Sequence, residues 1–212
     1  MAPTTKVAPA PKQERAKDTV SAVLKATNAA LKKGGEASVR IQDISAVTKV
    51  SIGSIYHHFG DRDGLIRAAY VDNYSAAISD DIERVRRFMQ SMNSANDIQE
   101  NYEEMAAFIT EHFVKFPARE QAFVIGSTAG RPLLREAIIK VQNELTNGLT
   151  EVMQLLKDRG ILKPGLEPRA AAVFVLGMLH GRIIAEFDRT PVSDKDWNFA
   201  MLTAFNGLFA TS

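Results

Sequence analysis

The sequence predicts an all-α protein with a small N-terminal domain of three short helices and a larger C-terminal helical bundle. From residue 15 onward, apolar residues recur at the i, i+3, i+4 spacing of amphipathic helices. No stretch sustains the period-two alternation of a half-buried strand. Residues 51–59 combine one apolar helix face with a face of hydroxyls and imidazoles that lacks carboxylates. These three observations predict the fold class, and the third indicates where the chain acts.

The N-terminal elements can be bounded from stop and cap residues. Residues 1–14 include three prolines and lack periodicity, which predicts a disordered tail. The first helix follows from residue 15 and ends at Gly34 and Gly35. The second covers residues 41–48, with three residues facing inward: Ile41, Ile44 and Val47.

A turn at residues 49 and 50 leads into the third helix, residues 51–59, which Ser51 can cap. Ile55 and Phe59 are four residues apart and form its buried face. Gly60 ends this helix, and Asp61 caps a long fourth helix. We therefore expect a domain over residues 15–60 and a second over residues 61–212.

The C-terminal part is expected to contain five further helices. Pro132 suits the first turn of one of them, and Gly160 suits the position just after its end. The predicted ranges are residues 97–116, 118–127, 132–159, 167–187 and 194–209.

Composition excludes several protein classes. The absence of cysteine excludes disulfides, thiol catalysis and cysteine-ligated zinc, and it fits a reducing cytoplasm. The N-terminus has no apolar core of a signal peptide. The longest apolar run, residues 170–179, is too short to span a bilayer. Residues 1–76 hold eleven Lys and Arg against seven Asp and Glu, while the rest of the chain has an acidic excess, so a polyanionic partner is expected only for the N-terminal part.

Residues 51–59 are the strongest functional signal. Their polar face consists of donors without acids, which suits a surface crowded by phosphates. Two short helices joined by a tight turn form a helix-turn-helix, whose second helix enters the major groove. The pattern therefore predicts a double-stranded DNA partner.

Residues 39–65, VRIQDISAVTKVSIGSIYHHFGDRDGL, closely resemble the DNA-binding segment of the TetR (tetracycline-repressor) family of bacterial regulators. The family's third helix reads roughly Val-Ser-x-Gly-Ser/Thr-x-Tyr-x-His/Tyr-Phe. The positions that match at unbroken spacing are Val50, Ser51, Gly53, Ser54, Tyr56, His58, Phe59 and Leu65. The remaining chain resembles the family in length and helical character.

The resemblance implies a role for each matching position. Ile52, Gly53 and Ser54 would approach base edges, with Ile52 suited to a thymine methyl group. The residues expected to contact phosphates are Ser51, Tyr56, His57, His58 and Arg62. Packing between helices is the alternative for Tyr56 and His58.

Two positions depart from the family pattern. Lys49 stands where the turn usually has glycine; a left-handed conformation there would cost about 1 kcal/mol but would bring an ammonium group near phosphate. Arg40 stands where the second helix usually begins with Ser or Thr. Arginine cannot cap with an oxygen but binds phosphate more strongly, and Ser38 could supply the cap.

The C-terminal bundle is expected to dimerise. Residues 170–187 are apolar almost all round, so one side needs a partner surface. The last helix adds an apolar stripe of Trp197, Met201, Leu202, Phe205, Leu208 and Phe209. TetR relatives pair two such helices from each chain, so we expect a homodimer formed by residues 167–209.

The resemblance also implies a cavity for a small-molecule effector inside the bundle. The polar groups expected beside its apolar walls are His112, Thr128 and His180, which favours a hydrophobic or aromatic effector. The residues expected to line it are Met105, Phe108, Ile109, His112, Phe123, Met153, Phe174 and Met178.

The spacing of the candidate catalytic and metal-binding residues argues against an enzyme. The segment from Gly126 to Gly130 resembles a nucleophile elbow only superficially, because Thr128 is central and no strand precedes it. The four histidines include no H-x-x-x-H pair, so no metal or other cofactor is expected. The sequence thus predicts a cytoplasmic, nucleoid-associated, ligand-responsive repressor that binds a palindromic operator. A TetR-like activator and an architectural DNA-binding protein without an effector are the alternatives.

Overall fold

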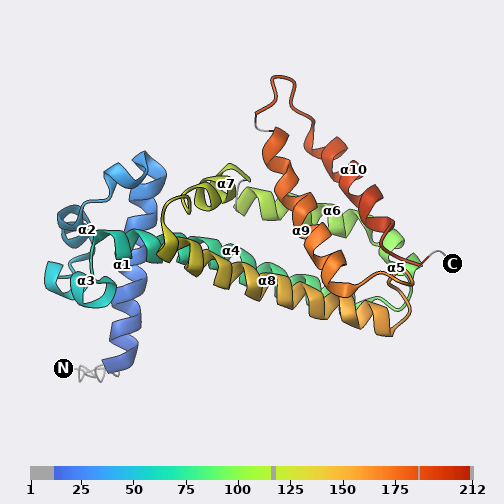
Figure 1. The fold of residues 1–212 in the computed structure, drawn as a ribbon, viewed down its shortest axis with the longest axis horizontal. Coiled ribbons are helices and arrows are strands. Elements are labelled where there is room, and N and C mark those ends of the chain that lie inside the picture. The colour runs from blue at the N-terminus through green and yellow to red at the C-terminus, as the bar shows by residue number, and fades with distance from the viewer. Residues whose placement is uncertain (1–11, 116–117, 186, 211–212) are drawn as a thin grey trace, which may run out of the picture. The chain divides into compact units, whose positions relative to one another are not determined.

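The computed structural model describes residues 12–115, 118–185 and 187–210. Side chains within these ranges are described except at residues 12–13, 76–82, 95, 99, 102, 109, 112–115 and 118–119. The described residues form helices, with one isolated antiparallel bridge between Leu162 and Phe209 (Figure 1). The predicted all-α class is confirmed.

The chain forms two compact units that divide between Asn73 and Tyr74, inside one long helix. We expected the division thirteen residues earlier, after residue 60. The N-terminal unit consists of α1 (Lys12–Gly34), the 3-10 turn η1 (Glu36–Ser38), α2 (Ile41–Thr48), α3 (Ile52–Phe59) and the beginning of α4 (Arg62–Ser91).

The core of the N-terminal unit takes side chains from each of its α-helices. Helix α2 packs against both α1 and α3. Thr27 is buried, and its hydroxyl donates to the Val23 carbonyl at 2.8 Å, so its polar group is satisfied. The fully or nearly fully buried apolar residues are Val23, Val39, Ile41, Ile44, Ile55, Leu65, Ile66, Ala69 and Tyr70.

Three details of this unit differ from the predictions. Val47 is 75% exposed, because each step of three residues from Ile41 rotates the side chain backward by about 60° on a helix of 3.6 residues per turn. Ser38 does not cap α2: Arg40 holds that position, and no side chain caps it. Helix α1 also begins at Lys12, three residues before the predicted start.

The C-terminal unit contains the rest of α4 and six further helices. These are α5 (Ala95–Glu100), α6 (Tyr102–Lys115), α7 (Ala118–Gly126), α8 (Pro132–Asp158), α9 (Pro168–Ala185) and α10 (Asp194–Asn206). Pro132 occupies the first turn of α8, and Gly160 has a positive φ of 71° after its end, as predicted.

One predicted helix is divided. Residues 97–116 were expected to be continuous, but α5 and α6 are separated at Asn101. The Asn101 amide nitrogen Nδ2 donates to the Asp97 carbonyl at 2.7 Å, and its backbone N–H donates to the same carbonyl at 3.1 Å. A side chain that competes for a helical carbonyl favours a turn, which explains the break.

Helices α4 and α8 run side by side in the same direction (Figure 1), as three side-chain links in matching order indicate. The Arg159 guanidinium, just beyond the end of α8, donates to the carbonyls of Gln90 and Met92 at 2.9 and 2.7 Å. It thereby satisfies acceptors that the end of α4 leaves open. The other two links join Tyr74 to Gln142 and Arg86 to Glu151.

Helix α9 packs against α8 on one face and leaves the other exposed. The exposed residues of α9 are Arg169, near the start of the helix, and an apolar stripe of Ala170, Val173, Phe174, Gly177 and Ile184. Among the described residues, α9 alone has the length and apolar composition that could cross a membrane, with a mean hydropathy of 1.2 over 18 residues. We expected no such segment. Core helices of soluble proteins meet the same criterion, and one buried face of α9 forms part of the core of the unit.

The apolar stripe of α10 differs from the expected interface. Met201, Leu202 and Phe205 are at most 7% exposed, because they fill the core of their own chain. Trp197 lies against Gly181, whose added Cβ would stand 3.6 Å from the ring, so this glycine serves an approach within the chain. Phe199, 64% exposed, is the large apolar side chain that α10 turns outward.

Candidate functional site

Helix α3 presents the polar surface that the sequence predicts. Ser51 caps it, with its hydroxyl accepting from the Ser54 backbone N–H at 3.2 Å. Ile55 is fully buried and anchors the helix to the core. The opposite face carries Ser51, Ile52, Gly53, Tyr56, His57 and His58, all exposed, with Ser54 half-buried.

The exposure of Tyr56 and His58 decides whether they pack between helices or are available for contact with DNA. Tyr56 is 45% exposed, and His58 is also exposed, with its ring edge-on to those of His57 and Phe59. Neither side chain is part of the interhelical core, so the packing alternative is wrong. Both are available to a molecule that approaches α3.

The corner between α3 and α4 fixes the recognition helix. Gly60 has a φ of 80°, a region that favours glycine. The Asp61 carboxylate accepts from the Gly64 backbone N–H at 2.6 Å and caps α4. A Cβ on Gly64 would lie 2.0 Å from the backbone oxygen of Phe59, so the corner closes only with glycine at this position. Sequence reasoning missed Gly64, whose only signal was a glycine in the first turn of a helix.

Arg62 binds two backbone carbonyls of the protein through two of its three guanidinium nitrogens. Its Nε donates to the Val39 carbonyl at 2.8 Å, and Nη2 donates to the Glu36 carbonyl. The hydroxyl of Tyr70, about two turns further along the same face of α4, donates to the Glu36 carboxylate at 2.9 Å. The Arg62 side chain therefore ties the turn between α1 and α2 to α4. Its Nη1 group makes neither of these bonds and the side chain is partly exposed, so the phosphate contact stays a prediction.

Lys49 is the non-glycine residue with positive φ in the part of the chain that the structure describes, at φ 61° and ψ 17°. Its backbone N–H donates to the Ser45 carbonyl at 2.9 Å and ends α2. The left-handed conformation anticipated from the sequence is present, at a cost of about 1 kcal/mol. Lys49 and Arg40 are both exposed, at the two ends of α2.

We predict that Lys49→Gly separates stability from DNA affinity. Glycine relieves the left-handed strain, so the free energy of unfolding should rise by about 0.5–1 kcal/mol. Loss of one phosphate contact should reduce the slope of log affinity against log salt by about 0.9. Chemical denaturation and DNA titrations at several salt concentrations measure both quantities. An unchanged slope would mean that the Lys49 ammonium does not reach DNA.

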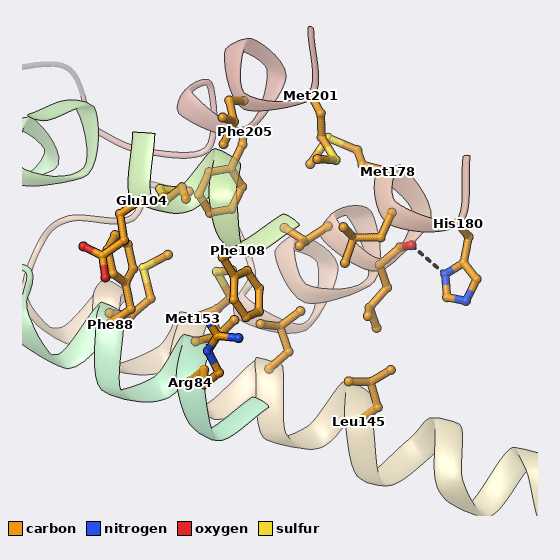
Figure 2. Close-up of a pocket in the computed structure, with 18 of the residues that line it drawn as sticks. Arg84, Phe88, Glu104, Phe108, Leu145, Met153, Met178, His180, Met201 and Phe205 are labelled. Carbon is orange, nitrogen blue, oxygen red and sulfur yellow. Dashed lines mark hydrogen bonds between the residues drawn. The ribbon is translucent and has the colours of Figure 1, made fainter. Parts of the chain in front are cut away.

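The C-terminal unit encloses a cavity of about 180 Å³. Met105, Phe108, Met153 and Met178 line it, and Figure 2 labels the last three. The other apolar lining residues are Val85, Phe88, Met89, Leu145, Leu149, Val175, Leu176, Leu179, Met201, Leu202 and Phe205.

Several predicted lining residues lie elsewhere. Phe123 and Phe174 are 53% and 48% exposed and do not line the cavity, because their helices turn them away from the core. Thr128 lies in the turn after α7 and donates to the Ile125 carbonyl. The side chains of Ile109 and His112 lie outside the described residues.

Five polar or charged residues line the cavity, of which only His180 was expected. The His180 Nδ1 lies 2.7 Å from the Leu176 carbonyl, and Arg84 pairs with Glu111 at 2.7 Å. Tyr74 donates to Gln142 Oε1 at 2.6 Å, and burial raises the pKa of its phenol to about 12, so it stays a neutral donor. Gln121 and Glu104 complete the set. Sequence reasoning missed these groups because they come from distant helices.

A cluster of three or more His, Asp or Glu side chains that could hold a metal ion does not occur among the described residues. The expectation of no metal stays a prediction. The residues from Ser127 to Gly130, which superficially resemble a nucleophile elbow in the sequence, form the turn that separates α7 from α8.

Comparison with known proteins agrees with this geometry. Residues 23–69 match the model of the bacterial regulatory proteins of the tetR family. A search of curated protein sequences finds no match.

Solved structures resemble the whole chain. A TetR-family transcriptional regulator from Mesorhizobium loti is 19% identical, with a TM-score of 0.71 over 93% of this chain and 99% of that one. A TetR transcription regulator from Haloarcula marismortui is 13% identical, with a TM-score of 0.68 over 92% and 100%. A transcriptional regulator from Saccharomonospora viridis, in complex with choline, is 12% identical, with a TM-score of 0.65 over 92% and 100%.

At these identities the structural likeness establishes a shared fold, while the family match covers the domain that carries α3. The two findings together show that residues 23–69 match the DNA-binding segment of the bacterial tetR-family regulatory proteins and that the chain has the fold of solved TetR-family transcriptional regulators.

Proposed function

We propose that this protein is a repressor that binds a palindromic operator as a homodimer and leaves it when a small, mainly apolar molecule occupies the C-terminal cavity. The exposed face of α3 carries this proposal, because its hydroxyl and imidazole groups are suited to phosphates and base edges. Members of the TetR family are transcription regulators, not enzymes.

The homodimer is supported by the exposed stripe of α9. Its five residues contain no charge, and Phe174 is half-exposed although the opposite face of the helix is well buried. A second copy of the stripe would cover this surface. Gly177 meets no atom within 4 Å and leaves room for the close approach of another helix.

The effector is supported by the cavity and by the course of α4. Leu65, Ile66 and Ala69 of α4 lie in the core of the N-terminal unit, while Val85 and Phe88 of the same helix line the cavity. A ligand that prefers one arrangement of α4 shifts the DNA-binding equilibrium by its difference in affinity, typically ~1–3 kcal/mol. One protein of this fold was solved in complex with choline, which supports a small-molecule role for such units.

The proposal is tested with DNA from upstream of the protein's own gene. We expect specific binding to a pseudo-palindrome whose half-sites are about one helical turn, or a multiple of it, apart. Fluorescence anisotropy at physiological salt compares this DNA with a random sequence of equal length. Equal affinity for both would overturn the proposal.

Substitutions on α3 should separate phosphate contacts from base contacts. Tyr56→Phe should weaken binding to specific and random DNA alike by about tenfold, because it removes one hydrogen bond to a charged group. Ile52→Thr should instead change which bases are preferred. Selection from a randomised operator library measures the base preference of each variant. A changed preference in Tyr56→Phe, or an unchanged one in Ile52→Thr, would contradict these roles.

A further inference from the structure

The polar groups of the cavity differ in what they can still bind. The Arg84 guanidinium is occupied, since it pairs with Glu111 at 2.7 Å and lies 5.1 Å from the centre of the Phe108 ring. A ligand carboxylate would have to displace Glu111 from Arg84 or share the Arg84 guanidinium with it. The cavity therefore offers no uncommitted cation among its described lining residues.

His180 is arranged as an acceptor. Its Nδ1 lies 2.7 Å from the Leu176 carbonyl, and a carbonyl oxygen only accepts hydrogen bonds, so Nδ1 carries the proton. In the neutral ring, Nε2 is then left with a free lone pair. Figure 2 shows the ring at one end of the cavity, with Nδ1 turned to Leu176.

Glu104 is an acceptor at the other end. Its side chain lines the cavity and is exposed, and its carboxylate forms no ion pair or hydrogen bond with a described residue. Figure 2 shows Glu104 and Phe88 at the side of the cavity opposite His180, with Phe108 and Met153 between them.

From these groups we infer that the cavity takes a lipophilic amine or ammonium compound, with its cationic head at Glu104 and its apolar body among the Met and Phe side chains. A fatty acid of the same length is disfavoured, because its carboxylate would meet the Glu104 carboxylate and a guanidinium that is already paired. A donor at the far end of the ligand would meet Nε2 of His180. The inference rests on the proposed function, in which this cavity holds the effector.

The test uses three probes with the same tail and different heads: octylammonium, octan-1-ol and octanoate. Isothermal titration calorimetry of the full-length protein, without DNA, measures the affinity of each. We expect octylammonium to bind best and octanoate worst. Glu104→Gln should weaken the binding of octylammonium by about fivefold, the upper end for an exposed ion pair, and leave octan-1-ol binding unchanged.

Glu103→Gln is the matched control. It removes the same charge from the neighbouring position of α6, where the side chain is exposed and does not line the cavity. This variant should bind all three probes as the wild type does. Far-UV circular dichroism and the melting temperature check that both variants fold.

The inference is overturned if octanoate binds best, if Glu104→Gln leaves the ranking unchanged, or if none of the probes binds. Failure of the proposed function gives a different result. If the cavity binds amines but does not regulate DNA binding, octylammonium binds with the expected ranking and its addition leaves the affinity for upstream DNA unchanged. Release of that DNA by anionic compounds alone would leave the proposed function standing and reject the ligand class.

Discussion

Phe174→Glu is expected to convert the proposed dimer to monomers at micromolar concentration and to abolish the proposed tight operator binding. The side chain is 48% exposed on a stripe without charges, so the substitution disturbs little of the chain's own core. In a dimer, the two stripes would bury the new carboxylate without a partner, at a cost of roughly 3–5 kcal/mol. In the proposed dimer each chain would read one half-site, so a monomer would also lose the advantage of binding two half-sites together.

Light scattering coupled to size exclusion measures the mass, and anisotropy measures the DNA affinity. Val47→Glu is the control, because it makes the same kind of change at a 75% exposed position of the N-terminal unit. It should leave the dimer intact. A wild-type mass of one chain, or a dimeric Phe174→Glu protein, would refute the proposed interface.

Gly64→Ala should unfold or distort the N-terminal unit. An added Cβ would lie 2.0 Å from the backbone oxygen of Phe59, so two backbone segments must separate. Such overpacking typically costs about 1–3 kcal/mol and occasionally more, and it acts here on the corner that holds α3. We expect a lower melting temperature and loss of specific DNA binding.

Gly53→Ala provides the comparison. A Cβ at Gly53 would meet no atom within 4 Å, and alanine favours a helix interior by about 0.5–1 kcal/mol over glycine. This variant should therefore keep or raise its melting temperature while approaching DNA less closely. Equal melting temperatures for Gly64→Ala and the wild type would contradict the tight corner.

Local chemistry made the N-terminal unit predictable. The Ser51 cap, the stop at Gly60 and the Asp61 cap act within a few residues, so they can be identified in the sequence, and the structure has all three. The left-handed Lys49 was predictable for the same reason.

Features that depend on distant parts of the chain were not predictable. Phe174 lies on a helix that is apolar on both faces, so periodicity could not decide which face meets the core. The bonds of Arg62 to the carbonyls of Glu36 and Val39 depend on the folded turn between α1 and α2, so the sequence could not predict them. The position of Glu104 in the cavity wall was not predicted, because a single carboxylate on a helix usually faces solvent.

Helix α4 runs without interruption through the boundary at Asn73 and Tyr74. A change in its length at this point therefore changes both the distance and the rotation between the residues on either side. Each residue of an α-helix adds about 100° of rotation and 1.5 Å of length. A chimera with one extra residue at this boundary would rotate one unit by about 100°, whereas seven extra residues would nearly restore the phase and add about 10 Å. Exchanging the N-terminal unit between regulators of this fold therefore requires the helical register of α4 to be kept. Any residues added at the boundary should come in multiples of seven.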